Sequence, residues 1–114
     1  NSIEVNPTTV RVPVFYGHSE AVHLELAQKI TANKVKDIFM DNSNDVVLID
    51  EHKDGGYPCA ANECEHSNDV FVGRVREDIS IPNGINLWVV SNNIRKGAAY
   101  NSVQIAELLI KDYL

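Results

Sequence analysis

Two stretches of alternating apolar residues, 70–76 and 85–90, constrain the fold of this chain more than any other feature. Successive side chains of a β-strand point to opposite faces, so a period of two residues predicts a strand. Within the first stretch, this period puts Phe71 and Val75 on the face opposite Val72. A turn sequence containing Pro, Asn and Gly separates the two stretches. We therefore expect two neighbouring antiparallel strands.

The segment 9–15 has the same period, because valines alternate with Arg11, Pro13 and an aromatic residue. A second alternation runs over 21–26. The simplest interpretation is two strands joined by a short glycine-containing break at 16–19. Pro13 lacks an N–H group, which places the first strand at a sheet edge or at a bulge.

Two segments have helical features. The first is predicted to begin with Thr31 as its N-cap and to run to about Met40, where the polar residues 41–44 end it. The second covers 97–113, where apolar residues recur at helical spacing. Between them, the polar segment 50–68 is the longest irregular stretch, and loops of this length are commonly functional or interfacial.

A short apolar run at 46–49 adds a further strand, so the order is strand, strand, helix, strand, strand, strand, helix. This order predicts the α+β class, with a mixed, mainly antiparallel sheet and two helices. A chain of 114 residues holds one modest core, which indicates one domain or part of one. The final helix has an apolar face too wide for one covering layer. We expect another domain or another subunit to cover it.

Composition bears on partners and compartment. The chain has 10 Lys and Arg against 16 Asp and Glu, a net charge of −6, and its basic residues are scattered. This balance disfavours nucleic acid as a partner. No apolar run approaches the roughly 20 residues of a membrane helix, and no basic-then-apolar leader is visible. We expect a soluble, cytoplasmic protein without a membrane partner, and its start at Asn1 rather than Met predicts processing or excision from a longer chain.

Cys59 and Cys64 lie in the polar segment, close to His66. A disulfide, a metal site and two ordinary thiols are the alternatives. Structural zinc usually takes four ligands in closely spaced pairs, whereas this segment has a single pair of cysteines. We favour two free thiols in a reducing compartment and expect no metal site.

Arg11 is a candidate anion-binding residue. It is the only charged residue between Glu4 and His18. Its guanidinium offers a planar, bidentate anchor for a carboxylate or a phosphate. The alternative is an outward-facing strand arginine that pairs with Glu4, Glu20 or Glu25.

His18 follows Arg11 by seven residues and comes directly after Gly17, at the predicted break between strands. A neutral imidazole accepts a proton near pH 7, so His18 is a candidate general base. The alternative is an ordinary polar histidine. The sequence supplies no nucleophile for it, because adjacent side chains on an extended chain point apart and exclude a pair with Ser19.

Three collinear segments carry a family resemblance. They are 10–20 (VRVPVFYGHSE), 74–78 (RVRED) and 82–107, which includes PNGINLWVVS and NNIRKGAAYNSVQIAE. In order and spacing they resemble aspartate-semialdehyde dehydrogenases. Long collinear motifs are more specific than a lone short pattern, and here they span nearly the whole chain from Val10 onward.

The resemblance implies an NADP-dependent, reversible reductive dephosphorylation of aspartyl phosphate to aspartate semialdehyde and phosphate, in lysine, threonine and methionine biosynthesis. A cysteine thiolate forms the acyl-enzyme. By position, Arg11 would bind the substrate carboxylate and His18 would be the general acid and base that serves that cysteine. Asn101, where the last helix begins, would approach the nicotinamide end of the cofactor.

The family's cysteine nucleophile and Gly-rich nucleotide fold precede this region and are not in the sequence, so the resemblance implies a C-terminal fragment that is inactive alone. Residues 1–94 would be part of a catalytic and dimerisation domain like the C-terminal domain of glyceraldehyde-3-phosphate dehydrogenase, and a homodimer is expected. Residues 95–114 would form a helix that packs toward the absent nucleotide-binding domain. The rivals are N-acetyl-γ-glutamyl-phosphate reductase and a non-catalytic dimerisation paralogue.

Overall fold

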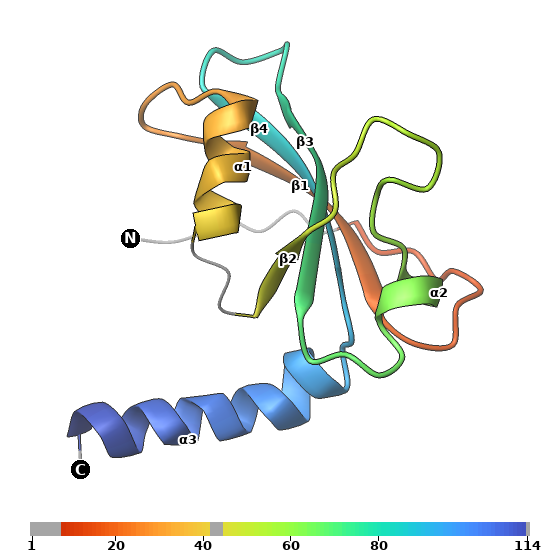
Figure 1. Ribbon diagram of the computed structural model, residues 1–114, viewed down its shortest axis with the longest axis vertical. Helices are drawn as coiled ribbons and strands as arrows, with labels where there is room; N and C mark the ends of the chain where they lie inside the picture. The colour runs from red at the N-terminus through yellow and green to blue at the C-terminus, as the bar shows by residue number, and fades with distance from the viewer. Residues whose placement is uncertain (1–7, 42–44, 114) are drawn as a thin grey trace.

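Residues 8–41 and 45–113, which the computed structural model describes, contain four strands in one mixed sheet (Figure 1). The strands are β1 (His18–Glu25), β2 (Val46–Leu48), β3 (Val70–Glu77) and β4 (Gly84–Ser91), and their order across the sheet is β1-β4-β3-β2. β4 is antiparallel to both of its neighbours, whereas β2 is parallel to β3. The predicted α+β class and the mixed, mainly antiparallel sheet are confirmed.

The helices are α1 (Ala32–Asp41), the short α2 (Ala60–Glu63) and α3 (Tyr100–Tyr113), which continues a π-helical turn at Arg95–Ala99. Thr31 caps α1 as predicted, because its Oγ1 accepts a hydrogen bond of 3.3 Å from the Lys34 backbone N–H. The residues predicted to end this helix, 42–44, lie outside the described residues. α2 interrupts the segment that was expected to be entirely irregular.

Each face of the sheet has its own buried cluster. One face packs against α1 and contains Val72, Val75, Ile85 and Leu87. The other face packs against α2 and contains Ala60, Cys64, Phe71 and Val90. The Trp88 indole packs against this second cluster, and its Nε1–H donates a 3.0 Å hydrogen bond to the Pro58 carbonyl. The segment around α2 is therefore fixed to the sheet beneath it.

A β-bulge in β3 changes which residues share a face. The pairing of β3 with β4 shifts between Gly73 and Arg76, and Arg74 has a positive φ of 51°. Beyond the bulge, Val75 lies on the same face as Val72, not on that of Phe71. The predicted distribution of these side chains is therefore wrong, since an extra residue inverts the alternation from that point onward.

The strand expected at 9–15 is also absent from the described structure. These residues are exposed and lie outside the sheet, and the Val14 N–H donates to the nearby Val12 carbonyl at 2.9 Å. The expected hairpin is replaced by a long-range pairing, because β1 pairs with β4. Pro13 cannot donate to a ladder, and an alternation without a partner strand gives no sheet.

The predicted C-terminal helix is confirmed, and it extends away from the sheet (Figure 1). None of its described residues is buried. Exposed apolar side chains form a broad apolar stripe along the helix: Val103, Ile105, Leu108, Leu109, Ile110 and Tyr113. No described helix is long and apolar enough to cross a lipid bilayer.

Candidate active-site residues and their setting

The segments that carry Arg11, His18 and Asn101 all leave the same end of the sheet. His18 begins β1 and lies opposite Ser91, the last residue of β4. Arg11 precedes His18 by seven residues, and the chain after Ser91 turns into the helix that carries Asn101. This arrangement follows from the antiparallel pairing, which places the start of β1 beside the end of β4.

Arg11 lies in the exposed segment before β1. Within residues 8–41 and 45–113, its guanidinium has no carboxylate partner. Pairing with Glu20 or Glu25 is therefore not observed, and Glu4 lies outside the described residues. The nearby Phe15 is 99% exposed, so the segment exposes both a cation and an aromatic ring.

His18 is exposed at the first position of a strand, not in a break between two strands as predicted. Its imidazole is therefore accessible to a solute while its backbone belongs to the sheet. Rigid placement of an accessible histidine suits proton transfer. Among the described residues, no hydrogen bond or ion pair joins Arg11, His18 and Asn101 to one another.

The residue before His18 is closely packed against the loop after α2. Gly17 has a φ of +87°, and a Cβ placed there would lie 2.5 Å from Cys64 Sγ and 2.7 Å from Cys64 Cβ. Cys64 is fully buried. Burial, followed by the charge of Glu63, raises the pKa of the Cys64 thiol above its ordinary value. A buried, protonated thiol is not a nucleophile, so its role is packing.

Asn92 connects this loop to the C-terminal helix. Its side chain is buried, and its Nδ2 donates a 2.7 Å hydrogen bond to the Cys64 carbonyl. Its Oδ1 accepts from the backbone N–H groups of Ile94 and Arg95, each at 3.0 Å. A single amide therefore joins Cys64, which packs against Gly17, to the first turn of the C-terminal helical segment.

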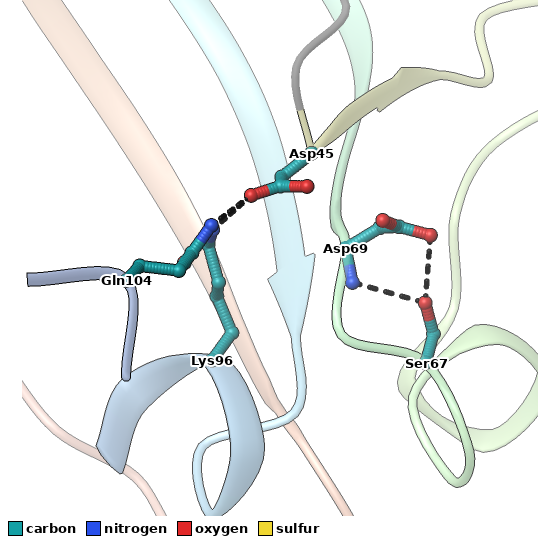
Figure 2. A network of polar contacts seen from close by, with 5 residues as sticks. All are labelled: Asp45, Ser67, Asp69, Lys96 and Gln104. Atoms are coloured by element: carbon teal, nitrogen blue, oxygen red, sulfur yellow. Dashed lines mark hydrogen bonds and ion pairs between the residues drawn. The ribbon is translucent and has the colours of Figure 1, made fainter. Parts of the chain in front are cut away.

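A second polar network fixes the base of α3 against the start of β2 (Figure 2). The Asp45 carboxylate accepts hydrogen bonds from Lys96 Nζ, at 3.0 Å, and from the Gln104 amide. These two donors, Lys96 first, lower the pKa of Asp45 below its ordinary value. The Lys96 ammonium also lies 5.5 Å from the centre of the Tyr100 ring. The direction of α3 is thus set by polar contacts at its first turns.

The same end of the sheet contains a turn that leads into β3. The Ser67 hydroxyl donates to the Asp69 carboxylate at 2.9 Å and accepts from the Asp69 backbone N–H at 3.0 Å (Figure 2). This local turn fixes the chain between α2 and β3. Among the described residues, no hydrogen bond or ion pair joins this turn to Arg11, His18 or Asn101.

Asn101 is exposed in the first turn of α3. It lies one turn before Ile105, so the two share the edge of the apolar stripe. Its amide can donate and accept hydrogen bonds to a partner that reaches this stripe.

The cysteines are free thiols, which contradicts the disulfide alternative. Cys59 is half-buried ahead of α2, and its backbone N–H donates to the Glu63 carboxylate at 2.5 Å. The His66 imidazole pairs with Glu65, at 3.7 Å and at the surface. Across the described ranges no three His, Cys, Asp or Glu side chains are grouped as metal ligands would be.

A family model described as "Semialdehyde dehydrogenase, dimerisation domain" matches residues 1–96. This chain belongs to that family. Its match covers the whole sheet and both described helices that pack on it, and it ends at the turn that begins the C-terminal helical segment.

Individual relatives of this dimerisation domain agree. An aspartate-semialdehyde dehydrogenase of Shewanella violacea is 57% identical over 113 residues, and one of Legionella pneumophila is 53% identical over 114 residues. These matches cover 99% and 100% of this chain but only 32% and 33% of the relatives. The chain therefore spans about a third of the length of the curated relatives it matches.

A solved structure gives the same result. The crystal structure of aspartate semialdehyde dehydrogenase II complexed with ASA from Vibrio cholerae superimposes with a TM-score of 0.85 at 50% sequence identity. The superposition covers 96% of this chain and 31% of that one. The fold of the dimerisation domain is therefore shared at high identity with an enzyme of this class.

Proposed function

We propose that this chain is the C-terminal part of an aspartate-semialdehyde dehydrogenase, which interconverts aspartyl phosphate and aspartate semialdehyde plus phosphate with NADP. The observation that carries the proposal is the 57% identity, over 99% of this chain, to a relative of that name. The proposal places the enzyme in lysine, threonine and methionine biosynthesis. Because the family's nucleophile and nucleotide fold precede this region, the isolated chain is inactive.

Arg11 binds the substrate carboxylate in this proposal. Its support is chemical, since an exposed guanidinium without an internal acidic partner is available for a bidentate interaction. His18 is the general acid and base that moves protons to and from the cysteine nucleophile of the preceding domain. Its exposed ring on an ordered strand supports this role.

NADP supplies or accepts the hydride when it is bound. In this chain no Gly-rich loop is available for its phosphates, so the main binding domain lies elsewhere. The residue that fits one end of it is Asn101, whose amide can pair with a carboxamide at the edge of the apolar stripe. A cofactor contact at Asn101 is thus a secondary one.

The proposal also assigns the parts of the chain. Residues 1–94 contribute to a catalytic and dimerisation domain, and the description of the matching family supports a homodimer. Residues 95–114 form a helix whose exposed apolar stripe packs toward the nucleotide-binding domain. The two free thiols are consistent with a reducing compartment, and we place the enzyme in the cytoplasm.

A fusion enzyme tests the proposal. It joins the preceding two-thirds of the Shewanella violacea relative to residues 1–114 of this chain. NADPH formation is then measured with aspartate semialdehyde, phosphate and NADP⁺. The fusion is expected to turn over and the isolated chain is not. N-acetyl-glutamate semialdehyde serves as the competing substrate. A fusion that folds and forms a dimer but lacks turnover would contradict the proposal, as would turnover by the isolated chain.

Two variants of the fusion test the residue roles. His18→Asn is expected to lower kcat by roughly 10²–10⁴-fold, the usual contribution of a general acid and base. Arg11→Lys keeps the charge but removes the planar fork, so KM for aspartate semialdehyde is expected to rise about tenfold or more. A His18→Asn variant with unchanged kcat would refute the assignment of the proton-transfer role.

A further inference from the structure

We propose that Cys64 and Asn92 are positioning residues for His18. They act through Gly17 and do not touch substrate. The inference rests on the function proposed above for His18, and it assigns a role to the segment 50–68, which the sequence leaves as a polar loop.

Gly17 packs directly against Cys64. A side chain at Gly17 would overlap the Cys64 thiol, and the Ser91 carbonyl lies 3.1 Å from the same Cβ position. The backbone that leads into His18 is therefore held between β4 on one side and the α2 loop on the other. A displacement of Cys64 changes the course of the chain one residue before the imidazole.

Cys64 is itself held in place by packing and by hydrogen bonds. Its side chain is buried in the cluster with Ala60, Phe71 and Val90. Its backbone N–H donates to the Ala60 carbonyl at 3.4 Å, and its carbonyl accepts from Asn92 Nδ2 at 2.7 Å. Packing and hydrogen bonding therefore fix both the side chain and the backbone of this residue.

Asn92 links Cys64 to the start of the C-terminal helical segment. It directly follows Ser91, the residue that pairs with His18 across the sheet. Its Nδ2 faces the Cys64 carbonyl while its Oδ1 caps the Ile94 and Arg95 N–H groups. The two ends of this amide thus have separate tasks, and one atom can be changed without the other.

Asn92→Asp makes that change in the fusion enzyme. The carboxylate keeps an acceptor for Ile94 and Arg95 but replaces the donor to Cys64 with a second, repelling oxygen. The matched control is Asn68→Asp, which adds the same charge beside the same turn. Asn68 Oδ1 accepts from Arg95 Nη1 at 3.1 Å, and among the described residues no hydrogen bond joins the Asn68 side chain to Cys64.

Asn92→Asp is expected to lower kcat by about tenfold or more, because a displacement of about 1 Å in a reacting group can cost up to a hundredfold. KM for aspartate semialdehyde should change by less than about twofold, since Arg11 lies outside this contact. The branch of the kcat–pH profile that depends on His18 should shift. That branch is identified by its absence in the His18→Asn variant. Asn68→Asp should leave all three unchanged.

Cys64→Ala provides a second route if Asn92→Asp folds poorly, with Cys59→Ala as its control. In the 114-residue chain, ring signals of His18 in NMR spectra should move in Asn92→Asp and Cys64→Ala but not in the controls. Unchanged kcat per folded enzyme and unchanged His18 signals in both variants would overturn the inference. If His18→Asn itself retains kcat, the proton-transfer role proposed for His18 fails instead, so the two failures are distinguishable.

Discussion

The Lys36 ammonium lies 2.8 Å from the Asp50 carboxylate, and this pair joins α1 to the bulge of β3. The Asp50 carboxylate also accepts hydrogen bonds from the backbone N–H groups of Arg74, at 3.0 Å, and Val75, at 3.1 Å. Its side chain is only 11% exposed and that of Lys36 only 19%. One carboxylate therefore satisfies the two donors that the bulge removes from the ladder.

Asp50→Ala is expected to lower the free energy of unfolding by about 3 kcal/mol, because it leaves a part-buried cation and two N–H donors without their acceptor. Lys36→Met should cost less, since the carboxylate keeps both N–H donors. Lys34→Met, on the exposed side of α1, is the control and should stay within about 0.5 kcal/mol. Urea unfolding measures all three, and a loss below about 1 kcal/mol for Asp50→Ala would disprove the role of this carboxylate.

Gly73, in β3, lies against the Ile49 backbone and the Pro58 ring. A Cβ at this position would overlap the Ile49 carbonyl oxygen and lie 2.5 Å from Pro58 Cδ. Gly73→Ala is therefore expected to destabilise the fold by about 3 kcal/mol or more. Gly55→Ala is the matched control, because Gly55 has a φ of +73° but open space around it, and backbone strain alone costs about 1–2 kcal/mol. Equal losses in thermal unfolding would contradict the packing argument.

Asp45 gives stability a dependence on acid pH. Its folded-state pKa lies below the ordinary value of 3.8 because Lys96 and Gln104 donate to its carboxylate. The charged form is favoured by folding, so this contribution is present above pH 3.8 and is lost as pH falls through the lower folded pKa. Asp45→Asn should have a lower free energy of unfolding than the unmodified chain at neutral pH. It should also lose less of that free energy as the pH falls below 3.8. Asp41→Asn is the control, and identical acid titrations of the two variants would exclude the effect.

The two cysteines should react differently. Cys59 is half-buried, whereas Cys64 is fully buried with a raised pKa, so an alkylating reagent should modify Cys59 first and Cys64 only after denaturation. Folding favours the neutral Cys64 thiol. Its contribution to stability is therefore complete below the ordinary pKa of 9.0 and declines as pH rises toward the higher folded value. Mass spectrometry measures the rate at which each cysteine is modified. Equal rates for Cys64 and Cys59 would contradict the burial of Cys64.

The apolar stripe of α3 should make the isolated chain self-associate, because an uncovered apolar surface favours oligomers. The double variant Ile105→Ser with Leu109→Ser should reduce that association in sedimentation experiments, while Glu107→Ser, on the polar side of the helix, should not. In the fusion enzyme the same double variant should lower thermal stability, since the stripe would then be covered. No difference between the two variants in either protein would argue against a covered stripe.

Local patterns predicted much of this fold. β3, β4 and α1 follow from alternation, turn residues and the Thr31 cap, which are properties of neighbouring residues. The segment 9–15 has the same alternation but no partner strand, and pairing depends on contacts that no local pattern contains. The bulge after Gly73 was missed for the same reason, because its stabilising carboxylate, Asp50, is distant in sequence.

The candidate site was predictable only in part. Arg11 and His18 stand out by residue type, but their specific roles, and that of Asn101, come from the family resemblance. The contacts that surround them join residues far apart in the chain, such as Asp45 with Gln104 and Asn92 with Cys64. A buried amide or a buried thiol has no distinguishing neighbour in the sequence, so only the folded arrangement identifies it.

The hydrogen bond from Trp88 to Pro58 has a spectroscopic consequence. The chain contains a single tryptophan, and its ring lies against the buried cluster that includes Cys64. Intrinsic tryptophan fluorescence therefore reports, without any added label, on the buried cluster that contains Cys64 on the α2 face of the sheet. Loosening of the α2 segment would change the emission maximum before the sheet itself unfolds, which separates local opening from global denaturation.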